Sequence, residues 1–355
     1  MKNKRTRARS LKHVRLFLTL LVIIASHPLF AAAPLSLKDQ GSFFVNGEVA
    51  KTDNPGGGNE PGRIVVNQMY VDYAIPSVQK LRAWPVIMVH GSGHTGKTYD
   101  TTPDGREGWK NYFLRKGISV YVVDQVGRAR SGWDPTPINN AESQSDSKLI
   151  PKGGLVRFTY ERAWSVFRFG PKPYEWWPDS KFPKESLDQY MAQLVPNTEA
   201  TLPQPPRKTL DALIALLNKI GPAIIMVHSQ SGLYGTLTAL ARPDLVKGYV
   251  NIEGRSGCEL TPDQITTMTK VPWLVVAGDH EWNGEEQCTK SVAAVKTGGG
   301  SASFLATYEH GVRGNTHMMM MDTNNLQIAD WIIAWLDKNA AKKPPAIGKK
   351  LIDIH

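Results

Sequence analysis

The chain has 355 residues, a hydrophobic content of 41% and a formal net charge of +10 at pH 7. Seven basic residues and no acidic residue lie in the first 15 positions, so the rest of the chain has a net charge of only +3. A nucleic-acid-binding surface is therefore not indicated, and the length and apolar content favour one large α/β domain.

The first 33 residues have the composition of a secretory signal peptide. A basic start is followed by the apolar run 16–25, which is too short to span a bilayer, and residues 31–33 are alanines that suit cleavage. Pro34 disfavours a cut directly after Ala33, so a signal anchor is the alternative. We expect an exported protein, periplasmic or secreted, without a membrane span.

Strands and one helix are predicted up to residue 124. Residues 43–49 and 63–75 alternate apolar and polar side chains, which is typical of half-exposed antiparallel strands. Residues 85–89 and 118–124 are rich in consecutive apolar side chains and indicate buried strands, with a helix over 109–116 between them. This order predicts a mostly parallel central sheet flanked by helices.

A glycine-rich loop, residues 90–96, follows the first buried strand. Its continuation into Gly96-Lys97-Thr98 is similar to the end of a phosphate-binding loop. That motif runs directly into a long helix, whereas residues 99–108 are turn-rich. A nucleotide-binding protein is therefore disfavoured.

Residues 133–206 interrupt the alternation of strands and helices. The stretch contains many prolines and stands between the strand ending at Asp124 and a helix predicted over 209–220. Its aromatic side chains either line an apolar pocket or form a small core of their own. They include Trp133, Phe158, Trp164, Phe167, Phe169, Tyr174, Trp176, Trp177 and Phe182.

The next strand ends at a serine. Residues 224–227 are apolar, the sequence His-Ser-Gln-Ser-Gly follows at 228–232, and residues 233–241 suit a helix. A serine on a tight turn between strand and helix projects from the sheet edge toward a base, and the next backbone N–H points at a developing oxyanion. Ser229 is thus the candidate nucleophile, and the alternative is a serine-rich helix N-cap.

Three further strands are predicted, and each ends in residues that could join a catalytic triad. Glu253 follows the first strand, Glu281 the second, and His310 and His317 the third. An amphipathic helix and a basic tail, residues 341–355, close the chain. The predicted strands and helix are 247–252, 271–277, 303–308 and 326–336.

The chain has two cysteines, Cys258 and Cys288. An even count in an exported protein favours a disulfide, and adjacent parallel strands would bring the loops that carry them to one edge of the sheet. Two cysteines without histidines at ligand spacing do not make a zinc site, so no metal is expected.

These motifs resemble those of the α/β-hydrolases, in particular secreted bacterial serine esterases whose triad acid is glutamate. The resemblance is carried by the His90-Gly91 loop, by His-Ser-Gln around Ser229, by Gly-Asn-Thr-His ending at His317, and by the 24-residue spacing from Ser229 to Glu253. The usual G-x-S-x-G turn has Val227 and Ser231 in place of its glycines.

The resemblance implies a role for each of five residues. Ser229 would be the nucleophile, His317 the general base and Glu253 the orienting acid, while the backbone N–H groups of Ser92 and Gln230 would form the oxyanion hole. The alternatives that stay open are Glu281 as the acid and His310 as the base.

The sequence therefore predicts an exported α/β-hydrolase with one domain over 34–340 and a cap insertion at about 133–206. We expect it to cleave a small apolar or aromatic carboxylic ester, or a lactone, through an acyl-enzyme and without metal or organic cofactor. A homodimer is left open. The alternatives are lactone-specific or C–C bond hydrolysis on the same triad, and a non-catalytic binding protein of this fold. Ser229 excludes haloalkane dehalogenases and epoxide hydrolases, which need an aspartate at that position.

Overall fold

The computed structural model describes residues 34–53, 60–149, 156–197 and 207–340. The predicted signal peptide, the basic tail and parts of the predicted cap insertion fall outside these residues. The chain divides between Pro34 and Leu35, and every described strand and helix lies in the second unit, Leu35–His355.

An eight-stranded sheet has the order β1-β2-β4-β3-β5-β6-β7-β8. The pairs β1–β2 and β2–β4 are antiparallel, and every other neighbouring pair is parallel. The predicted α/β fold with a mostly parallel sheet is thus confirmed. Its strands are β1 (Leu37–Thr52), β2 (Gly62–Pro76), β3 (Val86–Val89), β4 (Val120–Asp124), β5 (Ala223–His228), β6 (Val246–Ile252), β7 (Trp273–Ala277) and β8 (Ala302–Ala306).

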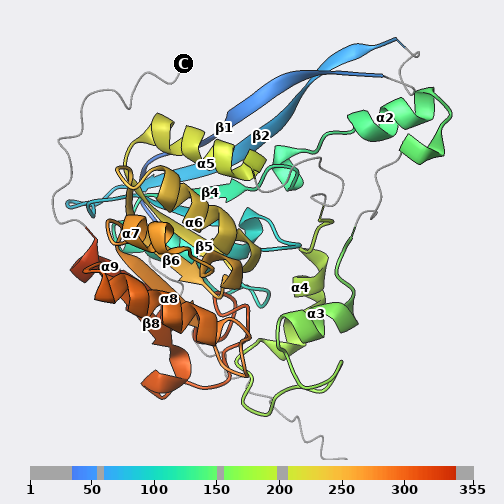
Figure 1. Cartoon of the computed structure of the whole chain (residues 1–355). Coiled ribbons are helices and arrows are strands. Elements are labelled where there is room, and N and C mark those ends of the chain that lie inside the picture. Colours follow the sequence, from blue (N-terminus) through green and yellow to red (C-terminus); the bar gives the residue numbers. More distant parts are fainter. Residues whose placement is uncertain (1–33, 54–59, 150–155, 198–206, 341–355) are drawn as a thin grey trace, which may run out of the picture. The chain divides into compact units, whose positions relative to one another are not determined.

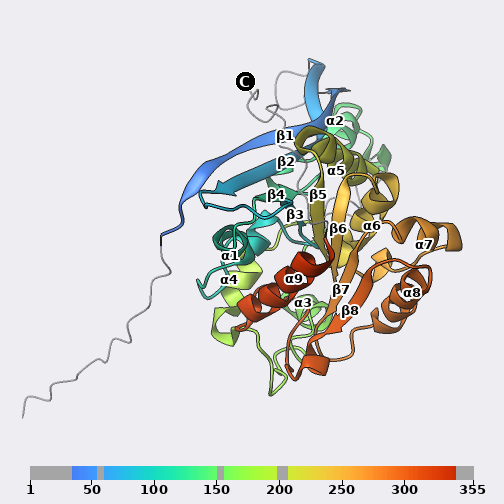
Figure 2. The same cartoon turned by 90° about the vertical axis from the view of Figure 1, so that its left-hand side faces the viewer.

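Helices cover both faces of the sheet, which explains why β3 is apolar at every position and why β4 and β5 carry a carboxylate or imidazole side chain only at their last residue. In β3, Val86 and Met88 belong to one buried cluster and Ile87 and Val89 to the other. The helices α1 (Trp109–Arg115) and α9 (Asn325–Asn339) pack into the first cluster. On the opposite face, as Figure 2 shows, are α5 (Arg207–Ile220), α6 (Gly232–Ala241), α7 (Pro262–Met268) and α8 (Glu285–Thr297).

The two parts of the stretch between β4 and α5 pack in different regions of the protein. Helix α2 (Thr136–Ser143) packs beside the β1–β2 hairpin, where the Asn140 side chain accepts from the Asp53 N–H at 3.3 Å and Asn139 donates to Thr52 at 3.2 Å. Helices α3 (Tyr160–Val166) and α4 (Leu187–Ala192) lie well away from α2 (Figure 1).

Five aromatic side chains of α3, α4 and their loops are buried. Trp164, Phe167, Phe169, Phe182 and Tyr190 are each at most 2% exposed. They belong to the same buried cluster as α1 and α9, so they extend the main core. The separate small core that the sequence left open is therefore not what forms, because these five side chains join the main core, while Tyr174 is 61% exposed.

None of the helices in the described part of the chain has the length and apolar character that crossing a bilayer requires.

Candidate active site

The turn after β5 holds Ser229 in a strained conformation. Its φ of 57° lies in the left-handed region, which costs a residue other than glycine on the order of 1–3 kcal/mol. A short 3₁₀ helix, Ser229–Ser231, then leads into α6. The hydroxyl of Ser231 accepts from the His228 N–H at 3.0 Å and lies 3.1 Å from the carbonyl oxygen of Val89, so it ties the turn to β3.

Val227 occupies a position where the usual turn has glycine, and the helix opposite accommodates it. Gly235 of α6 faces this valine: a Cβ at Gly235 would lie 2.8 Å from Val227 Cγ1 and 2.5 Å from Tyr249 Cε2. Close packing of helix on strand needs one small residue of the pair, and here the helix supplies it.

Ser229, Glu253 and His317 come together at the carboxyl ends of the parallel strands. His317 Nε2 lies 2.8 Å from Ser229 Oγ, and His317 Nδ1 hydrogen-bonds to Glu253 Oε2. His317 is itself held by His228, whose Nε2–H donates to the His317 carbonyl oxygen at 2.8 Å. Burial keeps the pKa of His228 well below its ordinary value, so that histidine stays neutral.

Glu253 is buried and its second oxygen is also held. Oε1 accepts from the Gly278 N–H at 2.6 Å and from Arg168 Nη2 at 2.5 Å. Burial alone would raise the pKa of Glu253, but the Arg168 charge and the hydrogen bonds from His317 and Arg168 lower it to about 2. The carboxylate therefore remains ionised at neutral pH.

Arg168 was missed by the sequence analysis. It stands among the aromatic residues of the 133–206 stretch, 85 positions before Glu253, and no motif surrounds it. The only local signal is that Arg168 lies between two apolar residues, Phe167 and Phe169.

The loop after β3 approaches the Ser229 turn closely. A Cβ at Gly91 would lie 2.9 Å from both Ser229 Cβ and His228 Nδ1, so only glycine fits. His90 Nε2 accepts from the Gln125 N–H at 3.0 Å, so Nδ1 carries the proton and donates to the Gly91 oxygen at 2.9 Å. Burial lowers the pKa of His90 to about 4, so the ring is neutral and holds the loop in place through these two hydrogen bonds.

The comparisons with known proteins come from both sequence and structure. No protein-family model matches the chain. A curated protein named "Probable secreted lipase phiG", from Fungal sp. (strain ATCC 74256), is 30% identical in an alignment 325 residues long, and the match covers 76% of this chain and 86% of the relative. The chain belongs to the α/β-hydrolase superfamily. It is a hydrolase of the esterase and lipase type.

A solved structure of a novel bacterial esterase agrees with this assignment. It is 37% identical in sequence to the hydrolase, with a TM-score of 0.81 over 87% of this chain and 98% of the esterase chain.

A cavity of about 660 Å³ opens above Ser229 and His317 in the hydrolase. Most of its lining residues are polar, and Val166 and Trp282 are its large apolar side chains. Among the described residues, none of the aromatic side chains that the sequence analysis named in the 133–206 stretch lines this cavity, so an aromatic lining supplied by that stretch is not found here. The other lining residues are Ser165, Arg168, Gln230, Glu253, Arg255, Ser256, Glu259, Glu281 and Asn283.

The two alternative triad residues, Glu281 and His310, take no part in the hydrogen bonds that join Ser229, His317 and Glu253. Glu281 is exposed at the cavity wall, while the imidazole of His317 is bonded to Glu253. His310 packs against Trp331 of α9, with ring centroids 5.2 Å apart.

The phosphate-loop alternative also finds no support in the hydrolase. The Gly96 N–H donates to the Asp124 carboxylate at 2.6 Å, where a phosphate would have to lie. Lys97 turns to the Thr101 carbonyl oxygen at 2.8 Å, and only the four-residue 3₁₀ helix Gly96–Tyr99 follows the loop.

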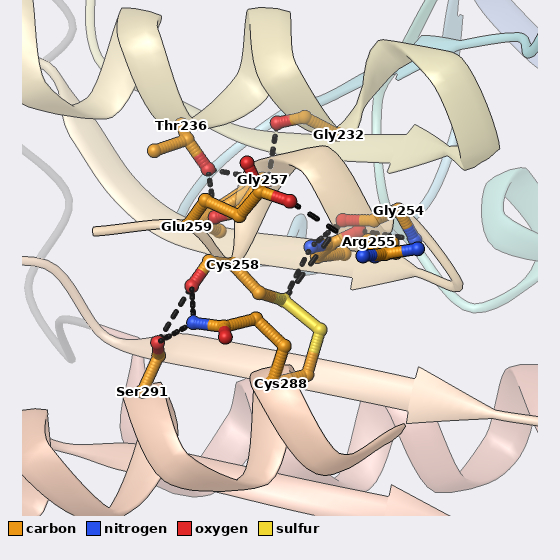
Figure 3. Close-up of a disulfide and its surroundings, with 12 residues drawn as sticks. Gly232, Thr236, Gly254, Arg255, Gly257, Cys258, Glu259, Cys288 and Ser291 are labelled. Atoms are coloured by element: carbon orange, nitrogen blue, oxygen red, sulfur yellow. Dashed lines mark hydrogen bonds and ion pairs between the residues drawn. A yellow bond between two sulfur atoms is a disulfide. The ribbon is translucent and has the colours of Figure 1, made fainter. Parts of the chain in front are cut away.

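The disulfide predicted between Cys258 and Cys288 is present. It links the loop after Glu253 to α8, as Figure 3 shows. The carbonyl oxygen of Cys258 also accepts from Ser291 Oγ at 2.6 Å and from Gln287 Nε2 at 3.2 Å. The loop that carries Glu253 is thus fixed covalently and by hydrogen bonds.

Asp179, Asp279 and His280 bring possible metal-ligand atoms within 4.8 Å of one another. His280 Nε2 lies 3.1 Å from Asp179 Oδ1, and Asp279 Oδ2 accepts from the Gly314 N–H at 3.1 Å. The Arg313 guanidinium lies 3.6 Å from Asp279 and competes with a cation there. We assign no metal to this cluster.

Proposed function

We propose that the protein is a serine hydrolase that cleaves a carboxylic ester through an acyl-enzyme, with Ser229 as nucleophile, His317 as general base and Glu253 as orienting acid. The observation that carries this proposal is the hydrogen-bonded chain from Ser229 Oγ through His317 to the ionised Glu253. Serine is a weak nucleophile unless a positioned base takes its proton, and His317 would be that base.

In the first step Ser229 Oγ forms a bond to the ester carbonyl carbon, and its proton passes to His317 Nε2. The carbonyl oxygen becomes an oxyanion, which the backbone N–H groups of Ser92 and Gln230 would stabilise. The bond to the alcohol oxygen then breaks, and His317 returns the proton to the departing alcohol. The acyl group stays on Ser229.

Water completes the reaction by the same route. His317 takes a proton from the water as its oxygen adds to the acyl carbon. The bond to Ser229 Oγ then breaks, His317 gives the proton to Ser229, and the carboxylic acid leaves. Glu253 remains ionised throughout and stabilises the imidazolium in both halves. A lactone follows the same steps, with the alcohol retained on the product.

Covalent labelling tests this function directly. The protein should hydrolyse p-nitrophenyl butyrate and should lose that activity when diethyl p-nitrophenyl phosphate phosphorylates Ser229, as located by peptide mass spectrometry. Retention of activity after complete labelling of Ser229, or labelling of another residue with loss of activity, would refute the assignment.

The predicted signal peptide and a relative named as a secreted lipase support export of this chain. Fractionation of the producing cells tests this, because a protein retained in the cytoplasm with its first 33 residues intact would contradict export.

A further inference from the structure

The segment of residues 156–197, which carries α3 and α4, contacts the proposed triad at its acid. Arg168 donates from Nη2 to Glu253 at 2.5 Å and from Nε to the Asp279 carbonyl oxygen at 3.0 Å. Arg168 has a φ of 55°, so its backbone is held in a strained conformation by its surroundings. Its guanidinium cannot leave Glu253 without removing a donor from a buried carboxylate.

The same segment contacts the proposed base. The His317 N–H donates to the Phe167 carbonyl oxygen at 3.0 Å. The two rings are nearly parallel, at 15°, with centroids 6.0 Å apart. The backbone position of the histidine therefore depends on a residue of this segment.

The loop of the proposed oxyanion hole is held by the end of the segment. Asn197 Oδ1 accepts from the Gly93 N–H at 2.9 Å, and Asn197 Nδ2 donates to Ser92 Oγ at 2.5 Å. The Val195 N–H donates to the Gly93 carbonyl oxygen at 2.9 Å. One asparagine side chain thus binds two successive residues of the loop.

A buried histidine adds a further link to that loop. His94 Nδ1 donates to the Ser92 carbonyl oxygen at 2.7 Å, and His94 Nε2 accepts from the hydroxyl of Tyr190 at 3.0 Å. Burial lowers the pKa of His94 to about 3, so the ring is neutral and has one donor and one acceptor nitrogen, as these two contacts require.

The apolar side of the segment is continuous with the main core. Its buried aromatic side chains share a cluster with Tyr99, Trp109 and the run Met318–Met321 directly after His317. Lifting the segment would expose these rings to water and break the polar contacts to Glu253, His317, Ser92 and Gly93 together. An open state would therefore lack an assembled catalytic site.

We propose that the 156–197 segment is a fixed wall of the active site and not a lid, so that the enzyme hydrolyses ester molecules dissolved in water without activation at a lipid surface. Asn197 and Arg168 act as positioning residues for the oxyanion loop and for the acid. This inference rests on the proposed function. It differs from what a lipase with a mobile lid would do, where an interface must open the site.

Rate measurements on tributyrin test the substrate class. The initial rate should rise hyperbolically with concentration below the solubility limit and should show no step when an emulsion forms. A rise of fivefold or more on passing the limit would overturn the inference. Even then, loss of tributyrin hydrolysis in Ser229→Ala would still support the proposed function. The absence of any Ser229-dependent ester hydrolysis would refute the proposed function itself.

Asn197 variants test the positioning role. Asn197→Ala should lower kcat about 10- to 100-fold with little change in KM, because the oxyanion donor loses its support. Affinity for a trifluoromethyl ketone, which forms an oxyanion on the enzyme, should fall in parallel. Asn197→Asp should recover most of the rate, since a carboxylate can accept from both the Gly93 N–H and the Ser92 hydroxyl.

Asn140→Ala is the matched control, because Asn140 belongs to the same insertion but binds the β1–β2 hairpin. It should keep the wild-type kcat. Wild-type kcat in folded Asn197→Ala would overturn the positioning role. If Asn197→Ala does not fold, the Asp variant decides: a large loss of kcat and of ketone affinity in folded Asn197→Asp would contradict the expected rescue.

Discussion

Arg168 Nη2 lies 2.5 Å from Glu253 Oε1, and this contact joins a residue between α3 and α4 to the carboxylate that bonds to His317. The arginine side chain is 12% exposed and that of the glutamate is fully buried. A buried pair of this kind is costly to break from one side only, because the remaining charge loses its partner.

Arg168→Met should therefore impair both stability and turnover. We expect the free energy of unfolding to fall by up to about 3 kcal/mol, and kcat to fall at least tenfold, because Glu253 is left with an uncompensated charge. Arg168→Lys keeps the charge and should lose less of both. Denaturant titration and steady-state kinetics measure the two effects, and an Arg168→Met variant with wild-type kcat would contradict the role.

Ser229→Ala should abolish ester hydrolysis while the protein stays folded. Loss of the nucleophile in such triads lowers kcat on the order of 10⁶-fold. Ser42→Ala, an exposed serine on β1, is the control and should keep full activity. A Ser229→Ala protein with more than about a hundredth of the wild-type rate would be incompatible with the proposed mechanism.

Glu253→Gln and Glu281→Gln should differ sharply. An acid that orients the base and stabilises its imidazolium is worth about 10⁴ in kcat. Glu281 is exposed at the cavity wall, so its amide variant should keep kcat within a few-fold. If Glu281→Gln, and not Glu253→Gln, were the variant with the large loss of kcat, the acid would have to be reassigned to the loop after β7.

The pKa of Glu253 predicts how stability depends on pH. In the folded protein it is about 2, below its ordinary value of 4.5, so the unfolded chain binds the proton more readily between these values. The stabilisation, on the order of 3 kcal/mol, is fully present above about pH 5 and is lost as the pH falls toward 2. Wild type and Glu253→Gln should thus differ most near pH 7 and converge in acid. A difference in unfolding free energy that does not change with pH would count against this ionisation.

Reduction of the Cys258–Cys288 bond should lower Tm. A cross-link between residues 30 positions apart stabilises the fold by about 3–4 kcal/mol in the chain-entropy model. Ser291 and Gln287 still bind the Cys258 carbonyl oxygen after reduction, so kcat well below Tm should change less than about threefold. Thiol titration of the unfolded, unreduced protein checks the bond, since two free thiols per chain would disprove it.

Much of the fold was predictable from local patterns. The apolar runs that became β3, β4 and β5 need no distant information, because a strand buried on both faces is apolar at every position. Ser229, Glu253 and His317 could be proposed for a similar reason. Each follows a strand, and the carboxyl ends of parallel strands meet at one edge of the sheet.

The tertiary structure decided the points that depend on segments far apart in the chain. Arg168 and Asn197 have no motif, and their partners lie 85 and 105 residues away. The space for Val227 comes from Gly235 on the facing helix, and the aromatic side chains after residue 156 could line a pocket or fill a core until the segment's position was known. Sequence periodicity reports which side of an element is buried, but only packing determines which side chain it meets.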